Sequence, residues 1–158
     1  MSILAYPSEM LLKTTKKVET YDSELEDIVK IMKKELNFTT GVGLAANQIG
    51  IDRQIFIYKY GINEGVVINP KITKNGKLIL EQEGCLSLKG ITAPTLRNEI
   101  VILEGYNLKG DKIKIKAKNY LARIFQHEVD HLNGKLYIDR LQKYKREELV
   151  KQYLENSK

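Results

Sequence analysis

The stretch QHEVDH, residues 126–131, contains both histidines of the chain within one H-E-x-x-H motif. Apolar residues around it recur at helical spacing, and the pattern ends near Asn133-Gly134, which is typical of a left-handed helix cap. On a helix, His127 and His131 lie on one face with Cβ atoms about 5–6 Å apart, so they can bind one divalent metal ion. Glu128 then lies beside the open coordination position, where a carboxylate can take a proton from metal-bound water.

A hydrolytic metal site usually has three protein ligands and one open position, and two residues are candidates for the third ligand. Asp139 lies downstream of the motif, and Cys85 follows a predicted strand that would present its thiolate and a neighbouring backbone N–H. Simpler interpretations exist, because H-E-x-x-H also occurs by chance on surface helices and a lone cysteine is commonly a small buried apolar residue. The residues alone leave the choice open.

The rest of the chain predicts an α+β fold. A helix is expected over residues 23–36, where Ser23 and Glu26 form a capping box, and a last helix over residues 142–154. Asn75-Gly76 predicts a hairpin turn. The expected strands cover residues 54–58, 65–70, 78–80, 100–106 and 112–116, and the last two are joined at Gly110-Asp111.

The composition excludes several classes of protein. The chain has 158 residues, 42% of them apolar and 29% charged, which fits a single domain over residues 1–158 and neither a disordered nor a fibrous protein. Its aliphatic runs are too short to cross a bilayer and no secretory signal is visible, so we expect a cytoplasmic protein without a membrane partner. The single cysteine fits a reducing compartment.

The charge pattern says little about binding partners. A net charge of +6 does not by itself indicate a nucleic-acid binder, so we expect no sequence-specific nucleic acid as a partner. The densest basic cluster is either a solvated helix start or a contact with an anionic partner such as RNA. Its members are Arg140, Lys143, Lys145 and Arg146.

The glycine-bearing segment GVGLAANQ, residues 41–48, resembles a phosphate-binding loop only superficially. It lacks the full G-x-G-x-x-G pattern and a P-loop lysine, which argues against nucleotide binding. Small residues at these positions let the backbone approach a ligand closely, with Gln48 as a neutral hydrogen-bond donor.

Three segments together resemble the peptide deformylase family: GVGLAANQ at residues 41–48, EGCLS at 83–87 and QHEVDH at 126–131. They occur in the family's order and at compatible spacing, and the segments at 3–7 and 130–136 are also similar, so the resemblance covers essentially the whole chain. It implies antiparallel β-sheets wrapped around a central metal-binding helix, with an N-terminal and a C-terminal helix.

The resemblance also implies an activity, the removal of formate from the N-formyl-methionyl end of newly synthesised polypeptides. It selects Cys85 as the third metal ligand beside His127 and His131, with water in the fourth position and Glu128 as the base that activates it. We expect the divalent metal to be Fe2+, although Zn2+, Ni2+ or Co2+ can occupy such a soft site of nitrogen and sulfur ligands.

Further residues receive roles from the same resemblance. The side-chain amide of Gln48 and the backbone N–H of Leu86 are expected to stabilise the oxyanion of the tetrahedral intermediate. The substrate's methionine side chain and backbone are expected to contact Val42, Gly43, Tyr120 and Ile124. Ordinary core packing is the alternative for Tyr120 and Ile124.

Three positions depart from the family's usual residues: Asn47 and Lys89 replace prolines, and Thr92 lies where some members have arginine. These differences leave the chemistry intact but affect loop rigidity and substrate preference. Glu83 and Arg97 are expected to form an ion pair that steadies the cysteine loop.

Helical tails in one branch of the family are thought to contact the ribosome, so the basic cluster at residues 140–146 predicts such a contact, and we expect a monomer. The rivals are a zinc endopeptidase that uses the same motif and a non-catalytic binding protein with a structural metal. A structural site would need a fourth protein ligand, and none is apparent in the sequence.

Overall fold

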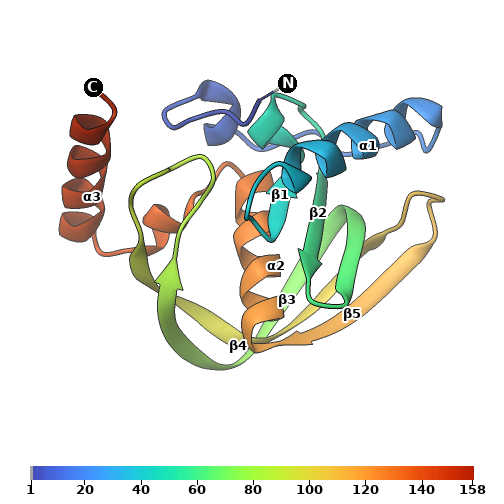
Figure 1. Cartoon of the computed structure of the whole chain (residues 1–158). Helices are drawn as coiled ribbons and strands as arrows, with labels where there is room; N and C mark the ends of the chain where they lie inside the picture. The colour runs from blue at the N-terminus through green and yellow to red at the C-terminus, as the bar shows by residue number, and fades with distance from the viewer. Residues whose placement is uncertain (1) are drawn as a thin grey trace.

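The computed structural model describes residues 2–158. Three α-helices and five β-strands follow one another with three short 3₁₀ helices between them (Figure 1). In chain order these are η1 (Glu9–Leu12), α1 (Ser23–Asn37), β1 (Gly43–Ala45), η2 (Ala46–Ile49), β2 (Ile55–Tyr60), β3 (Asn63–Glu83), β4 (Ala93–Tyr106), β5 (Lys112–Lys118), α2 (Asn119–Leu132), η3 (Tyr137–Arg140) and α3 (Lys143–Asn156).

The five strands form one antiparallel sheet in the order β1-β2-β3-β4-β5, so each strand pairs with the next one along the chain. The α+β class predicted from the sequence is confirmed, with a single sheet in place of several. The strand β3 is 21 residues long and its register against β4 shifts twice, after Ile68 and after Asn75. Such irregularities bend a strand locally.

The predicted hairpin turn at Asn75-Gly76 is wrong. Both residues lie inside β3, and the pairing with β4 resumes at Leu78 after a register shift. Gly76 has a φ of +73°, so the left-handed residue that a type I′ turn requires is used here in a bulge. The other predicted hairpin is confirmed, because β4 and β5 pair antiparallel around Gly110.

The central helix α2 packs against all five strands, and Figure 1 shows the sheet curving around it. Phe125 on α2 contacts two aromatic rings of β2, with ring centroids 5.9 Å from Phe56 and 4.9 Å from Tyr58. This apolar contact fixes one side of the helix against the sheet. The motif histidines project from another part of the same helix.

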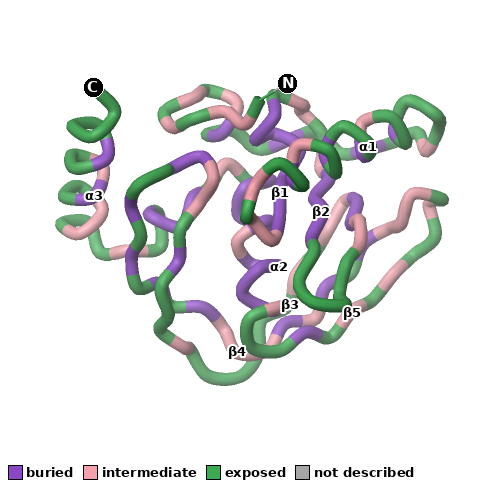
Figure 2. Tube along the Cα trace, viewed as in Figure 1, coloured by how far each residue is buried: buried purple, intermediate pink, exposed green. Residues whose placement is uncertain are grey.

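The two flanking helices differ in how firmly they pack. In α1, Asp22 accepts a hydrogen bond from the Leu25 N–H, so Asp22 caps this helix and the predicted Ser23 cap is off by one residue. One side of α1 is buried over the sheet, whereas α3 is mostly exposed and buries chiefly Leu149 and Tyr153 (Figure 2). Within residues 2–158, no helix is both long and apolar enough to span a membrane.

Candidate metal centre

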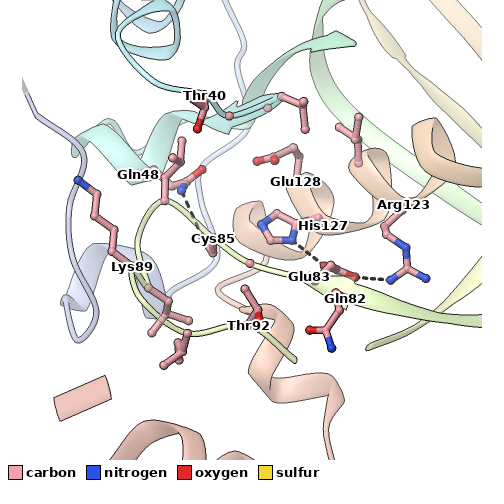
Figure 3. Close-up of a pocket in the computed structure, with 18 of the residues that line it drawn as sticks. Thr40, Gln48, Gln82, Glu83, Cys85, Lys89, Thr92, Arg123, His127 and Glu128 are labelled. Carbon is pink, nitrogen blue, oxygen red and sulfur yellow. Dashed lines mark hydrogen bonds and ion pairs between the residues drawn. The ribbon is translucent and has the colours of Figure 1, made fainter. Parts of the chain in front are cut away.

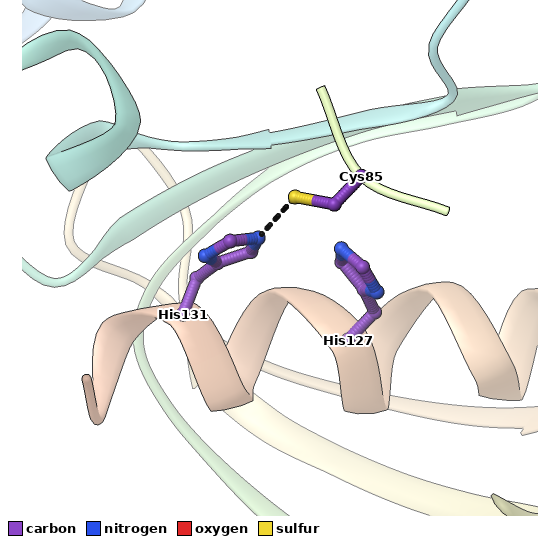
Figure 4. A group of neighbouring side chains, drawn as sticks. All are labelled: Cys85, His127 and His131. Atoms are coloured by element: carbon purple, nitrogen blue, oxygen red, sulfur yellow. Dashed lines mark hydrogen bonds between the residues drawn. The ribbon is translucent and has the colours of Figure 1, made fainter. Parts of the chain in front are cut away.

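The candidate metal ligands come from two distant parts of the chain, since Cys85 lies 42 residues before His127. The side chains of Cys85, His127 and His131 nevertheless meet in the fold (Figure 4). Their ligand atoms all lie within 4.8 Å of one another, and Cys85 Sγ is 3.3 Å from His131 Nε2. Burial opposes ionisation of the thiol, but His131 and His127 outweigh it and hold the pKa of Cys85 well below its ordinary value. A thiolate and two imidazoles are a donor set that suits zinc, iron and similar divalent ions.

The alternative third ligand, Asp139, lies outside this cluster. Its carboxylate accepts hydrogen bonds from Arg146 Nε at 3.0 Å and from the Leu136 N–H at 2.9 Å. Within residues 2–158, no fourth His, Cys, Asp or Glu joins the three ligand atoms. The donor set therefore leaves a coordination position open, as hydrolytic sites do and closed structural sites do not.

Glu83 at the end of β3 orients His127. Its carboxylate lies 2.8 Å from His127 Nδ1, which leaves Nε2 of that ring to face Cys85. Arg97 donates to both oxygens of Glu83, at 2.9 and 3.0 Å, so the predicted ion pair is present. Arg123 donates to the same carboxylate at 2.6 Å (Figure 3). Burial opposes ionisation, yet His127 and Arg97 hold the pKa of Glu83 far below its ordinary value.

The charge network continues beyond Glu83 to the C-terminal part of the chain. Arg97 Nη1 donates to Asp130 at 2.6 Å, and Arg140 donates to both oxygens of Asp130, at 3.0 and 2.5 Å. Arg123 and Asp130 were not singled out from the sequence. Asp130 lies inside the H-E-x-x-H motif, at a helical position that faces the core. A charged residue at such a position needs a partner of opposite charge, and this is the signal that would have indicated an ion pair.

Glu128 is 4% exposed and points into the cavity (Figure 3). Burial raises the pKa of its carboxyl above the ordinary value, although His127 and His131 oppose the shift. Its Oε1 has no hydrogen-bond partner among residues 2–158, so this oxygen is available to a ligand. Gly43 on β1 leaves the space for Glu128, because a Cβ built at Gly43 would lie 2.6 Å from Oε2.

Gln48 on η2 is held in one orientation. Its Oε1 accepts from the Ala45 N–H at 3.0 Å, and its Nε2 donates to Ser87 Oγ at 3.1 Å and lies 3.8 Å from Cys85 Sγ. The amide nitrogen therefore lies beside the candidate ligand Cys85 and its neighbour Ser87. The Leu86 N–H, next to Cys85, has no acceptor among residues 2–158.

One cavity of about 360 Å³ is lined by several of the residues described above (Figure 3): Gln48, Glu83, Cys85, Leu86, His127 and Glu128. All four predicted substrate contacts line it: Val42, Gly43, Tyr120 and Ile124. Ile124 is 4% exposed, whereas Tyr120 is 39% exposed and packs on Tyr60 with ring centroids 4.8 Å apart. The sequence did not indicate that the loop at 88–92 closes one side of this cavity.

The three departures from the family pattern lie close to the cavity. Asn47 is fully buried, and its Nδ2 donates to the His131 carbonyl at 2.6 Å, so it ties η2 to the C-terminal end of α2. Lys89 and Thr92 both line the cavity, and Thr92 lies beside Gly84.

Comparison with known proteins supports the family resemblance seen in the sequence motifs. A family model described as "Polypeptide deformylase" matches residues 1–147. Peptide deformylase of Dictyoglomus turgidum is 40% identical over 140 residues, covering 89% of this chain and 92% of the relative. Peptide deformylase 1 of Streptomyces avermitilis is 41% identical over 156 residues, covering 93% of this chain and 72% of the relative.

Solved structures agree with the sequence comparison. A crystal structure of a peptide deformylase from Legionella pneumophila superposes with a TM-score of 0.92 at 33% identity, covering 99% of this chain and 94% of that one. A peptide deformylase from Synechococcus elongatus, solved in complex with actinonin, gives a TM-score of 0.91 at 34% identity, covering 96% and 85%.

Proposed function

Since this chain belongs to the polypeptide deformylase family, we propose that it hydrolyses the N-formyl group, as formate, from the N-terminal formyl-methionine of newly synthesised polypeptides. The observation that carries the proposal is the cluster of one cysteine and two histidines, of which Cys85 and His127 line the same cavity as the buried Glu128. A site that cleaves a terminal amide needs an open coordination position, a base and donors for the oxyanion, and candidates for all three are present.

We propose that Cys85, His127 and His131 hold one divalent ion, with Fe2+ as the expected native ion and Zn2+, Ni2+ or Co2+ as possible replacements. When bound, such an ion polarises the formyl oxygen and lowers the pKa of water. The contact between Glu83 and His127 Nδ1 supports this assignment, because ligating histidines usually donate their second N–H to a carboxylate or carbonyl.

Glu128 is the proposed base. Its buried carboxylate takes a proton from the attacking water and then delivers it to the leaving amine, so one residue serves both halves of the reaction. Its raised pKa supports the first step, since a more basic carboxylate takes up a proton more readily. The Nε2 of Gln48 and the N–H of Leu86 donate to the oxyanion, and each such donor is worth about 3–4 kcal/mol.

The substrate side chain fits the apolar part of the cavity. Ile124 and Val42 supply aliphatic surface, and Tyr120 supplies one ring face near the rim. Among residues 2–158, the strand β1 pairs only with β2, so its second edge is free to pair with an extended peptide at Val42 and Gly43.

We also propose that the basic cluster at 140–146 contacts the ribosome. The ion pairs of two of its members reduce the number of residues available for this contact. Arg140 and Arg146 are ion-paired with Asp130 and Asp139, so Lys143 and Lys145 are the members left for a partner. Cosedimentation with ribosomes should weaken in a K143Q/K145Q variant. A cytoplasmic location is expected, because the Cys85 thiolate requires a reducing compartment, and a monomer remains the expected form.

The decisive experiment is a formate-release assay on anaerobically purified protein, with metal analysis of the same sample. The protein should release formate from a formyl-methionyl peptide, and Glu128→Gln should lose activity while keeping its metal content. If Glu128→Gln releases formate like the parent, Glu128 is not the base. Cleavage of peptides with blocked ends, without formate release, would instead indicate an endopeptidase.

A further inference from the structure

The strand β5 carries a row of four lysines on one face. Its sequence KIKIKAK alternates strictly, and Lys112, Lys114, Lys116 and Lys118 are all exposed, whereas the residues between them are half-buried or buried against α2. Alternate residues of a strand lie about 6.6–6.8 Å apart on one face, so the four ammonium groups follow a line of about 20 Å. We call these four residues the β5 lysine row.

The row has almost no compensating charge. None of its lysines forms an ion pair with any of residues 2–158. On the neighbouring strand β4, Glu104 is opposite Lys114, and Lys71 of β3 is opposite Glu104 on the other side. The sheet face over β3, β4 and β5 therefore carries an excess of positive charge in the described structure.

The position of the row links it to the cavity. Lys118 immediately precedes α2, and Tyr120, two residues later, lines the cavity. Figure 1 shows β5 and α3 at opposite ends of the molecule, so the row is separate from the basic cluster at 140–146.

We propose that the β5 lysine row binds the phosphate backbone of RNA without sequence preference, and so holds the cavity near RNA-bound nascent chains. The choice of RNA rests on the proposed function, because a polypeptide under synthesis is attached to RNA. A single file of unpaired ammonium groups matches a linear polyanion. A membrane surface is less suited, because the strongly exposed apolar side chains of residues 2–158 lie outside β5.

The β5 lysine row could have a simpler role than RNA binding, namely protection of the sheet edge. In the described part of the chain, the strand β5 is the last strand of the sheet and pairs only with β4, and lysines on such an edge prevent pairing with other chains. Edge protection predicts that loss of the lysines promotes self-association without any effect on RNA affinity.

The experiment measures the affinity of the holoenzyme for a fluorescent oligouridylate at several salt concentrations. Four phosphate contacts predict that log Kd changes with log salt with a slope of about 3, or roughly 50-fold weaker binding at 200 mM than at 50 mM salt. K112Q/K114Q/K116Q should reduce the slope by about 2, because three contacts are lost. Lys118 is left intact because it immediately precedes α2, two residues before Tyr120 of the cavity.

The matched control is K30Q/K33Q/K34Q, which removes the same charge from exposed positions of α1. The control should keep the parental slope, and both variants should release formate from a free formyl-methionyl peptide at the parental rate, which shows that they are folded. Equal RNA binding by the parent and the β5 variant, or equal losses in both variants, would overturn the proposal. So would binding to phosphatidylserine vesicles or polyglutamate in the absence of RNA binding. If the β5 variant binds RNA as tightly as the parent while both release formate, the RNA proposal fails and the proposed function stands. If the parent itself releases no formate, the proposed function fails.

Discussion

Glu128 and Gly43 show how closely one residue depends on another in this cavity. The carboxylate of Glu128 lies directly against the Cα of Gly43, the residue of the buried strand β1 that lines the cavity. The backbone of β1 therefore sets the position of the proposed base. Any side chain at position 43 has to displace the carboxylate, because the carboxylate is the far end of a flexible side chain and the strand is fixed by its pairing with β2.

Gly43→Ala should lower kcat by about 100-fold, since a misplacement of about 1 Å in a reacting group has this order of effect. The free energy of unfolding should change by less than about 1 kcal/mol, because the clash is relieved by a side-chain movement. Steady-state kinetics and urea unfolding on the same samples test both statements. A variant with parental kcat would show that Glu128 has room to remain in place.

The residues of the site differ in how far the sequence predicted them. The spacing of His127 and His131 places both on one helical face, and local geometry alone is enough for that inference. Cys85 needed the family resemblance, because nothing local reveals that the end of β3 meets α2. Arg123 pairs with Glu83 from 40 residues away, and such contacts depend on tertiary packing that no local pattern encodes.

At the scale of elements, helix positions were predicted within a few residues but the longest strand was not. Helical periodicity repeats over several turns, so the predicted helix over 23–36 corresponds to Ser23–Asn37 in the structure. In β3, the local turn signal of Asn75-Gly76 conflicts with long-range pairing to β4, and the pairing prevails. The glycine keeps its left-handed conformation and forms a bulge in place of a turn.

Gly76→Ala should destabilise the fold by about 1–2 kcal/mol, the cost of a left-handed conformation for a residue with a Cβ. The new Cβ would also lie 3.1 Å from an oxygen of Glu99. Urea unfolding measures the change. Lys77→Ala, at the next position and without a positive φ, is the matched control and should remain within about 0.5 kcal/mol. Equal losses in both variants would mean that the bulge does not require the glycine.

Across the whole molecule, one chain of charges connects the metal centre to the C-terminal region. It runs from Arg123 through Glu83, Arg97 and Asp130 to Arg140, and so joins β3, β4, α2 and η3. Buried charges are tolerated only when each is paired, and removal of one member leaves its neighbour uncompensated. The network therefore contributes more to the mutual position of these elements than to net stability.

Arg140→Gln tests the outer end of this network. Burial opposes ionisation of Asp130, but Arg140 and Arg97 hold the pKa of its carboxyl below the ordinary value of 3.8. The stabilisation is therefore fully present above about pH 4 and is lost as the pH falls below that value. We expect a loss of about 1–2 kcal/mol at neutral pH, between the values for exposed and buried pairs, and a smaller difference in acid.

Urea unfolding of the parent and Arg140→Gln at a series of pH values measures this difference. Arg146→Gln breaks a more exposed pair with Asp139 and should cost less than about 1 kcal/mol at neutral pH. A difference between the parent and Arg140→Gln that stays constant down to pH 2 would contradict the assigned role of Asp130.

The order of the strands also has a consequence for how the chain acquires its structure. Because every strand pairs with its neighbour in sequence, the sheet can grow by successive hairpins, each of which closes a short loop at small entropic cost. The meeting of Cys85 with α2 is different, since it closes a loop of about 40 residues. The sheet is therefore expected to form early and the metal centre late, so the thiol stays open to oxidants until the last folding step.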